Sequence, residues 1–181
     1  MNNTFWVHFI CVFLFRMTEK ERFFFNAIRL GDLAIVEKEL VDQPNLIDVI
    51  DDRGSSPLIL ASYYDHIDLT QFLIQAGAPV NFKDASGNTA LMGVCFKGVV
   101  ELAELLIKEG ADVNITNVMG TSALIFAAMF NRKDMIELLL ENKADKTIQD
   151  AKGLTALGHA KMKKDSEIIK FCLLYTSDAA D

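Results

Sequence analysis

The amino-acid sequence predicts an all-α solenoid, in which copies of one helix-turn-helix unit stack in a row. Two observations predict this fold. First, four glycines follow one another at intervals of 33 residues, at Gly54, Gly87, Gly120 and Gly153. Second, each glycine has Asp or Asn three residues before it, Ser or Thr two residues after it, and then Pro or Ala followed by Leu. A fixed period with a fixed pattern is typical of a supersecondary unit that packs against copies of itself.

The first helix of each unit is predicted from its two ends. A hydroxyl side chain two residues after each glycine is placed to accept a hydrogen bond from a free N–H of the first helical turn. These N-cap residues are Ser56, Thr89, Ser122 and Thr155. In one copy Pro57 follows, at the first helical position, where a missing N–H is harmless. The residues eleven positions after each glycine form a column of equivalent positions. This column is rich in residues that tolerate positive φ, which marks it as the C-cap position. It holds Asp65, Gly98, Asn131 and Lys164.

A second helix is expected in each unit, over residues 67–75, 100–108 and 133–141. Its apolar positions, such as Leu102 and Leu106, recur at spacings of three and four residues, which predicts one face that packs against a neighbour. Gly77 and Gly110 close this helix in two copies, and Lys143 occupies the same column in the next. A left-handed backbone at Lys143 is expected to cost about 1 kcal/mol.

These units resemble the ankyrin repeat. The motif pieces are Gly-x-Ser-Pro-Leu at 54–58, Gly-Ala-Asp-Val-Asn at 110–114, and the same motif at 77–81 with Pro79 in place of Asp. The resemblance covers roughly residues 26–171. It implies an ankyrin-repeat solenoid with short β-turn or hairpin-like loops. It also implies partners that dock on the concave side, which the turn tips and the exposed face of the first helices form.

The repeat boundaries follow from the period. An N-terminal capping repeat is expected over 17–50, because Thr18 and Glu21 have the spacing of a capping box. Its helices are expected at about 19–29, ending at Gly31, and at about 33–41. Further ankyrin repeats are expected over 51–83, 84–116 and 117–149, with a truncated C-terminal repeat over 150–171.

Both ends of the chain depart from the repeat. Residues 1–16 contain an apolar run that is too short to span a bilayer comfortably. Three interpretations stay open: upstream sequence read in frame ahead of a true start at Met17, which we favour, a signal peptide, or an anchor. Residues 172–181 resemble the translated read-through of a sequencing adapter. The native chain is therefore expected to be cut near Phe171, and no function is assigned to the tail.

Composition and motifs argue against several function classes. The formal net charge of −7 and the pI near 5 disfavour a nucleic-acid surface, which needs a basic stripe. The three cysteines lack the spacing of a metal site or a disulfide framework, and Cys95 is predicted to be a small core residue. We find no phosphate loop, paired metal ligands or nucleophile motif. No catalysis, cofactor or metal is therefore expected.

One column of carboxylates needs a separate interpretation. Asp51, Asp84 and Asp150 all stand three residues before their glycines, and Asn117 fills the same column in the remaining copy. A metal or acid–base site is one hypothesis. The stronger one is that each side chain bonds the backbone of its own turn, because Asp and Asn both do so at turn starts.

Two groups of residues are candidates for protein binding. Nine and ten residues after the glycines lie Tyr63, Tyr64, Phe96, Lys97, Met129, Phe130, Met162 and Lys163. Folding does not require apolar residues in these columns, and stacking would align them into one stripe typical of an interaction site. The alternative is that several tuck inward between repeats. The turn tips form a second tier, with Asp52, Arg53, Ser86, Asn88, Val118 and Met119.

The sequence therefore predicts a non-catalytic protein–protein interaction module, an adaptor or regulator that binds an unidentified protein on its concave face. We expect a cytoplasmic monomer, with no nucleic-acid partner and no membrane partner unless residues 1–16 are a real signal or anchor. Two alternatives stay open. The chain is the ankyrin portion of a larger enzyme or sensor, or it is an exported or anchored partner-binding protein.

Overall fold

The computed structural model of the chain describes residues 17–174. Within them the chain forms ten α-helices, one 3-10 helix and no strand. The helices are α2 (Glu19–Leu30), α3 (Leu33–Asp42), η1 (Pro44–Asp48), α4 (Pro57–Tyr63), α5 (Ile67–Gln75), α6 (Ala90–Lys97), α7 (Val100–Lys108), α8 (Ala123–Met129), α9 (Lys133–Glu141), α10 (Ala156–Lys163) and α11 (Ser166–Leu174). The interpretations of residues 1–16 lie outside the described residues, as does the part of the tail after Leu174.

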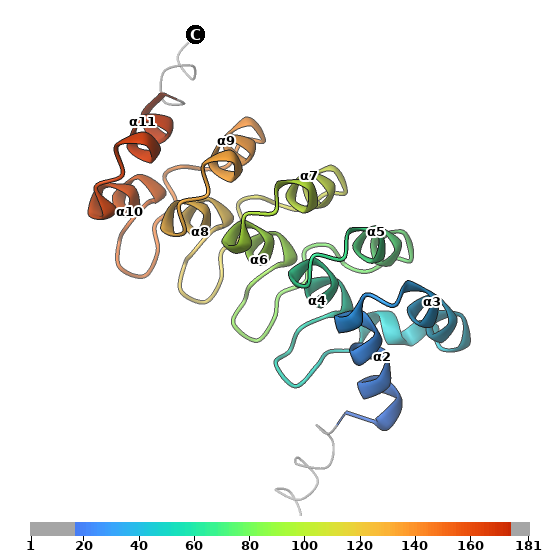
Figure 1. Cartoon of the computed structure of the whole chain (residues 1–181). Helices are drawn as coiled ribbons and strands as arrows, with labels where there is room; N and C mark the ends of the chain where they lie inside the picture. Colours follow the sequence, from blue (N-terminus) through green and yellow to red (C-terminus); the bar gives the residue numbers. More distant parts are fainter. Residues whose placement is uncertain (1–16, 175–181) are drawn as a thin grey trace, which may run out of the picture.

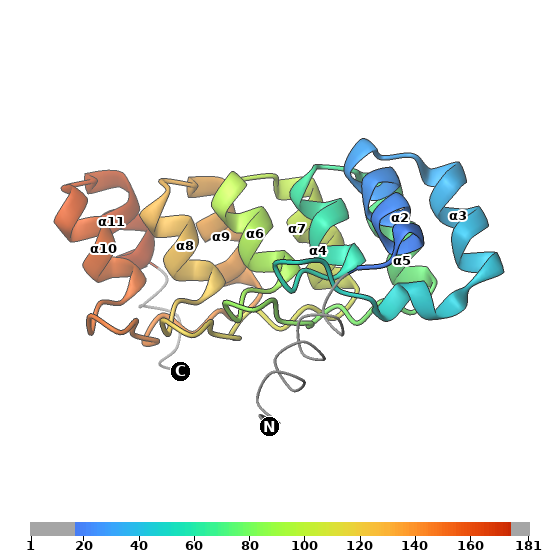
Figure 2. The same cartoon turned by 90° about the horizontal axis from the view of Figure 1, so that it is seen from below.

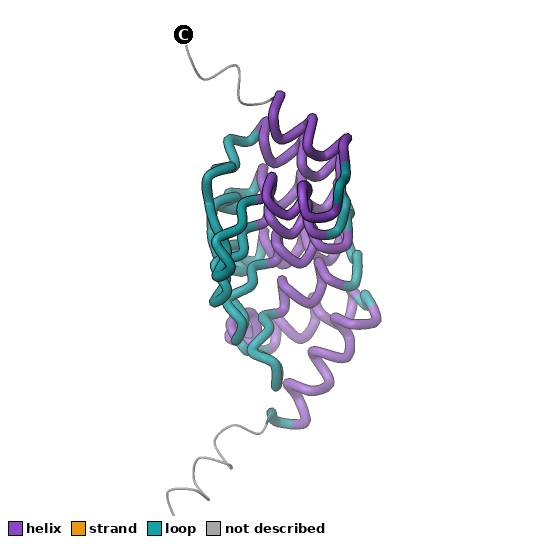
Figure 3. Tube along the Cα trace, turned by 90° about the vertical axis from the view of Figure 1, so that its left-hand side faces the viewer, coloured by secondary structure: helices purple, strands orange, loops and turns teal. Residues whose placement is uncertain are grey.

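The helices form two adjoining rows, and each unit contributes one helix to each row (Figure 1). The first row holds α2, α4, α6, α8 and α10, and the second holds α3, α5, α7, α9 and α11. Neighbouring helices of the first row contact one another, as do the two helices of each unit. The turns that lead into the first row project along one edge (Figure 2, Figure 3). The predicted all-α solenoid is confirmed.

The predicted N-caps of the first-row helices are confirmed as well. The four hydroxyl residues Ser56, Thr89, Ser122 and Thr155 each accept a hydrogen bond from the N–H three residues on, at 3.2–3.4 Å. The predicted C-cap positions have positive φ in every copy, from 57° at Lys164 to 87° at Gly98, but in α4 and α8 the C-cap residue itself is one position earlier. A hydroxyl that satisfies an N-terminal donor and a left-handed residue that ends the helix are both encoded locally. The sequence pattern therefore predicts these boundaries well.

The second-row helices α5, α7 and α9 span the residues that the sequence predicts. Gly77 and Gly110 follow α5 and α7 with φ of 98° and 91°. Lys143 takes the equivalent position after α9 with φ of 63°. A side chain therefore stands in the left-handed region where the other two copies have glycine, and the expected strain is present.

The N-terminal repeat has the predicted capping box. The Thr18 hydroxyl accepts from the N–H of Glu21, and the Glu21 carboxylate accepts from the N–H of Thr18. Helix α2 runs one residue beyond the expected end and closes at Gly31, where φ is 72°. The 3-10 helix η1 was not predicted. It fills the longer loop after α3 and buries Leu46 in the core.

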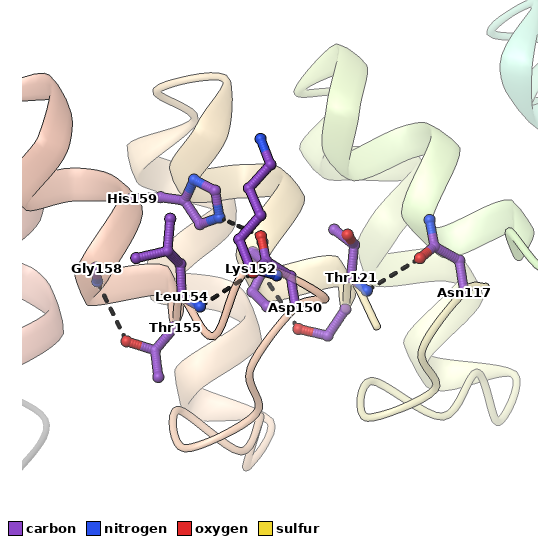
Figure 4. A network of polar contacts seen from close by, with 10 residues as sticks. Asn117, Thr121, Asp150, Lys152, Leu154, Thr155, Gly158 and His159 are labelled. Carbon is purple, nitrogen blue, oxygen red and sulfur yellow. Dashed lines mark hydrogen bonds and ion pairs between the residues drawn. The ribbon is translucent and has the colours of Figure 1, made fainter. Parts of the chain in front are cut away.

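Carboxylate or amide oxygens hold the turns, as predicted. The Oδ1 atoms of Asp51, Asp84, Asn117 and Asp150 each accept from two backbone N–H groups of their own turn, at 2.8–3.0 Å. Figure 4 shows this for Asn117 with Thr121 and for Asp150 with Leu154. The second oxygen of Asp150 lies 2.7 Å from Nε2 of His159. These oxygens therefore hold the turns in place through hydrogen bonds.

The core is linear and runs between the two rows. Leu58, Leu91 and Leu124 are fully buried, whereas Leu157 is half-buried and packs against the edge of the core. Leu157 is less buried because, within the described residues, its repeat packs against a neighbour on one side only. Cys95 is fully buried, and this burial raises the pKa of its thiol. The predicted structural role of Cys95 is therefore consistent with a protonated, inert thiol.

Helix α11 extends three residues past the predicted boundary at Phe171. Cys172 lies in this extension and is buried against the core. The start of the segment interpreted as a foreign tail is thus part of the last helix in this structure. The apolar character of this stretch continues the face that Ile168 buries, which accounts for the longer helix.

Polar side chains link each unit to the one before it. The four donors bond carbonyl oxygens in the last turn of the preceding first-row helix, and the pairs are His66 with Arg29, Lys97 with Tyr63, Arg132 with Phe96, and Lys163 with Met129. These carbonyls have no helical partner and sit at the negative end of the helix dipole, so donors and cations are stabilising there.

Two C-cap glycines make room for these links. A Cβ on Gly31 would lie 2.6 Å from the ring of His66, and one on Gly98 would lie 2.7 Å from the side chain of Arg132. Glycine at these positions is therefore favoured both by the positive φ and by the side chain of the next unit, although Asp65, Asn131 and Lys164 also take a positive φ in this column.

Candidate protein-binding surface

The four aromatic rings of the predicted stripe are exposed. Tyr63, Tyr64, Phe96 and Phe130 each keep between 37 % and 45 % of their surface accessible. Met162 is 70 % exposed, and Met129 is half-buried. The alternative that the rings tuck inward between repeats is therefore wrong for the four aromatic residues and partly right for Met129. Helices of the first row, which adjoin one another in space, carry all of them.

The rings contact one another in two groups. Phe96 and Phe130 meet edge to face with centroids 4.4 Å apart, and this pair bridges the ends of α6 and α8. Tyr63 and Tyr64 also meet edge to face, at 5.7 Å, and Tyr64 stacks on His66. Such contacts fix the side-chain rotamers before any partner arrives, which lowers the entropy lost on binding.

The two lysines of the stripe, Lys97 and Lys163, each contact the preceding unit. The Lys97 ammonium lies 2.6 Å from Oδ2 of Asp65 and 5.2 Å from the centroid of the Tyr63 ring. The Lys163 ammonium lies 5.9 Å from the centroid of the Phe130 ring. Lys97 was predicted as a contact residue, and the structure places it in the seam between α4 and α6, where its charge is paired.

The turn tips are mostly exposed, as expected. Asp52, Arg53, Ser86, Val118 and Met119 all face solvent, and Val118 has 72 % of its surface accessible. Asn88 differs, because it is half-buried and joins two turns. Its amide donates to Asp84, and its oxygen accepts from Asn117 at 2.9 Å.

Backbone hydrogen bonds also join successive tips. The Val118 N–H donates to the Ser86 carbonyl at 3.0 Å, and the Ala151 N–H donates to the Met119 carbonyl at 2.8 Å. These bonds join three of the four tips, and the first tip adjoins them where Gly54 lies close to Ala85, so the tips form a ridge beside the first-row helices.

A groove of about 480 Å³ lies between the ends of α4 and α6 and the tips that precede them. It brings together six of the predicted residues, namely Arg53, Tyr63, Tyr64, Ser86, Asn88 and Phe96. The other eight do not line it, namely Asp52, Lys97, Val118, Met119, Met129, Phe130, Met162 and Lys163. Phe130 adjoins the groove through its contact with Phe96.

Comparison with known proteins gives the same architecture. A family model described as "Ankyrin repeats (3 copies)" matches residues 76–150, and one described as "Ankyrin repeat" matches residues 53–85. This chain belongs to the ankyrin-repeat family. Ankyrin repeats are generally protein–protein interaction modules, and the family is generally non-catalytic.

Curated relatives of this ankyrin-repeat protein cover only part of it. The chain is 40% identical over 69 residues to mouse "Ankyrin repeat and SAM domain-containing protein 6", and 32% identical over 69 residues to the rat protein of the same name. In both cases the match takes up 38% of this chain and 8% of the relative.

Several groove residues of this ankyrin-repeat protein were not predicted. Ile59, Met92, Gly93 and Phe126 all line the groove. Gly93 is unusual in the sequence, because it is a glycine inside a predicted helix. The same column holds Leu60, Phe126 and His159 in the other copies. Glycine inside a helix costs about 1 kcal/mol relative to alanine, so an interior glycine indicates a need for space.

The two charged side chains that line the groove, Asp84 and Arg53, differ in whether they already have bonding partners within the protein. The Asp84 carboxylate accepts from two backbone N–H groups and from the Asn88 amide. The Arg53 guanidinium has no hydrogen bond or ion pair within residues 17–174.

In the same range, no group of three or more potential metal ligands comes together, and none of the helices is long and apolar enough to cross a bilayer.

Proposed function

We propose that this ankyrin-repeat protein is a non-catalytic adaptor or regulator that binds a protein partner on its concave face. This face comprises the exposed side of the first-row helices and the ridge of turn tips. The observation that carries the proposal is the set of four exposed aromatic rings at the ends of α4, α6 and α8, three of which line a groove of about 480 Å³. Exposed aromatic side chains that cluster beside a concavity are typical of binding hot spots.

Rigid docking fits this surface. The rings are fixed by edge-to-face contacts, and neighbouring units are joined by side-chain bonds to the preceding helix. A preformed surface pays little conformational entropy when it binds, and such interfaces move little between free and bound states. The chain is proposed to act as a monomer in the cytoplasm.

The test is partner capture from the lysate of the source cell, with Tyr64→Ala/Phe130→Ala beside the unchanged chain. We expect the unchanged chain to retain a protein that the double variant loses. The matched control is Val41→Ala/Gln75→Ala, which truncates two exposed side chains on second-row helices. Equal retention by the double variant would move the site away from the concave face. Complete unfolding of that variant, monitored by circular dichroism, would refute the assignment of its two rings to the surface, because the ring contacts that it removes are worth only about 0.5–1.5 kcal/mol each.

A second proposal is that these repeats are the binding part of a longer enzyme or sensor. It is supported by the curated relatives, of which the chain spans 8%, and whose names include a SAM domain beside the ankyrin repeats. Sequencing the transcript past the codon for Phe171 tests it. A stop codon close to that position leaves a stand-alone binding protein, whereas a long open frame supports the larger protein.

Export is the alternative to a cytoplasmic location, and it depends on residues 1–16 acting as a signal or anchor. N-terminal sequencing of the native protein decides between them. A product that begins at Met17 excludes the signal and the anchor.

A further inference from the structure

The groove between α4 and α6 is hollowed by the absence of one side chain. Gly93 lies in the middle of α6, where the equivalent residues of the neighbouring units are Leu60 and Phe126. A Cβ built on Gly93 would lie 3.9 Å from the Tyr63 ring and meet nothing closer. Unlike Gly98, Gly93 is therefore required neither by a positive φ nor by a close neighbour. What its small size leaves is an open space with an aromatic rim.

The lining of this space combines apolar and polar side chains. Tyr63 and Phe96 contribute exposed rings to it, and Met92 contributes a buried side chain. The lining also contains Arg53, whose guanidinium has no partner within residues 17–174. The carboxylate of the lining, Asp84, accepts hydrogen bonds from its own turn and keeps its negative charge. Arg53 is therefore the charged group of the lining that is available to pair with a partner's carboxylate, although the chain as a whole carries a formal charge of −7.

We propose that the groove takes an acidic peptide segment of the partner, with one large apolar side chain inserted above Gly93 and a carboxylate bound by Arg53. This inference rests on the proposed function and specifies the chemistry of the partner. The apolar side chain fills the place that Leu60 and Phe126 fill in neighbouring units, so its burial is driven by the same loss of apolar surface. The carboxylate forms a paired contact with the planar guanidinium. Tyr63 and Phe96 flank the inserted side chain.

The probe is a library of random twelve-residue peptides displayed on phage, selected on the full 181-residue chain. We expect enriched peptides to share a large apolar residue with Asp or Glu within a few positions. Synthetic copies of these peptides then report affinity by fluorescence anisotropy. Enrichment of basic peptides, or no enrichment above the starting library, would overturn the proposal.

The apolar half of the groove is tested by Gly93→Leu, which places the side chain of the neighbouring repeat in the open space. We expect it to weaken the selected peptides at least tenfold. Gly93→Ala is the matched control, since it adds only a Cβ at an ordinary contact distance from Tyr63 and should change affinity less than threefold. Unchanged binding by a folded Gly93→Leu chain would refute insertion at this position.

The charged half is tested by Arg53→Glu. We expect a loss of at least tenfold for acidic peptides and recovery when the peptide carboxylate is replaced by Lys. Lys152→Glu is the matched control, because Lys152 occupies the same column of a turn tip and does not line the groove. If both variants lose the same peptide affinity, the change in overall charge explains the loss, and the proposed contact between Arg53 and the peptide carboxylate is refuted.

The two proposals fail in different ways. Suppose that a peptide or partner still binds Gly93→Leu and Arg53→Glu but not Tyr64→Ala/Phe130→Ala. The concave face would then remain the proposed binding site, and the groove proposal would be refuted. Binding that is unchanged in all of these variants would refute both proposals.

Discussion

Phe96 and Phe130 form an edge-to-face pair between two repeats, with ring centroids 4.4 Å apart and planes inclined by 76°. Phe96 belongs to the last turn of α6, and Phe130 is the C-cap residue of α8. Both rings nevertheless remain more than a third exposed. The same side chains therefore contribute to the stacking of the repeats and to the surface that we propose for binding.

This pairing predicts a measurable coupling between the two residues. Phe96→Ala and Phe130→Ala should each destabilise the fold, and the double variant should lose less than the sum of the two. The expected coupling is about 0.5–1.5 kcal/mol, the usual value for aromatic pairs. A double-mutant cycle in urea unfolding measures it. Strict additivity would show that the rings touch without stabilising each other.

The left-handed backbone at Lys143 predicts that Lys143→Gly stabilises the protein. The substitution relieves a φ of 63° and should raise the free energy of unfolding by about 1 kcal/mol. Gly110→Ala is the matched change in the opposite direction, at the same column of the preceding repeat. A Cβ there has open space, so its cost is that of the backbone alone. Urea unfolding of both variants should give effects of opposite sign, and any other pattern contradicts the assignment.

A buried hydroxyl without a partner predicts a second stabilising change. The Oγ1 atom of Thr70 is buried and has no hydrogen-bond partner among residues 17–174, and the next repeats have Ala103 and Ile136 in this column. Thr70→Val keeps the shape and should stabilise by about 1 kcal/mol, because an unsatisfied buried hydroxyl is unfavourable. Thermal unfolding measures it. Ser62→Ala is the control that should not stabilise, since the Ser62 hydroxyl donates to the Ile59 carbonyl.

The position of a leucine in the stack predicts the cost of truncating it. Leu91→Ala should lose about 2–5 kcal/mol, because Leu91 is enclosed by repeats on both sides. Leu157→Ala should lose clearly less, since Leu157 is half-buried. Urea unfolding at one pH compares them. Equal losses would mean that burial does not set the cost at this column.

The environment of Asp150 predicts an acid-dependent contribution to stability. Its pKa is lowered chiefly by the hydrogen bond from the Leu154 N–H, with a further contribution from the bond with His159. A lowered carboxyl pKa in the folded state adds stability above the ordinary value of 3.8, and this stability is lost as the pH falls through the folded pKa.

Asp150→Asn removes that titration and keeps the oxygen that holds the turn, as Asn117 does naturally. The free energy of unfolding of Asp150→Asn should therefore fall less than that of the unchanged chain between pH 6 and acid below 3.8. Urea unfolding across this range measures the difference. Parallel pH profiles for the two chains would show that Asp150 is not a source of the acid dependence.

The local rules of the repeat explain why the fold was predictable from the sequence. A hydroxyl at an N-cap, a residue of positive φ at a C-cap and an Asp at a turn start each act within a few residues of the chain. Their 33-residue period predicted the helices from α4 to α9 with little error. Where the period was interrupted the prediction failed, as at η1, which fills a longer loop.

The candidate site was only partly predictable, because it forms between repeats. The columns indicated that Tyr63, Tyr64 and Phe96 lie on one stripe, and the structure places them around a single groove. They did not indicate that Asn88 joins two turns or that Lys97 is paired with Asp65. These roles depend on which side chains of adjacent units face each other across the stack.

The sequence by itself determined the repeat, its caps and the two rows of helices, since these arise from hydrogen bonds and apolar spacing within one unit. Only the tertiary structure decided where the surface opens. The groove beside Gly93 forms where Tyr63 of one unit and Gly93 and Phe96 of the next line the same space across the seam between α4 and α6. Such a space is a property of two packed units, so no pattern confined to one of them specifies it.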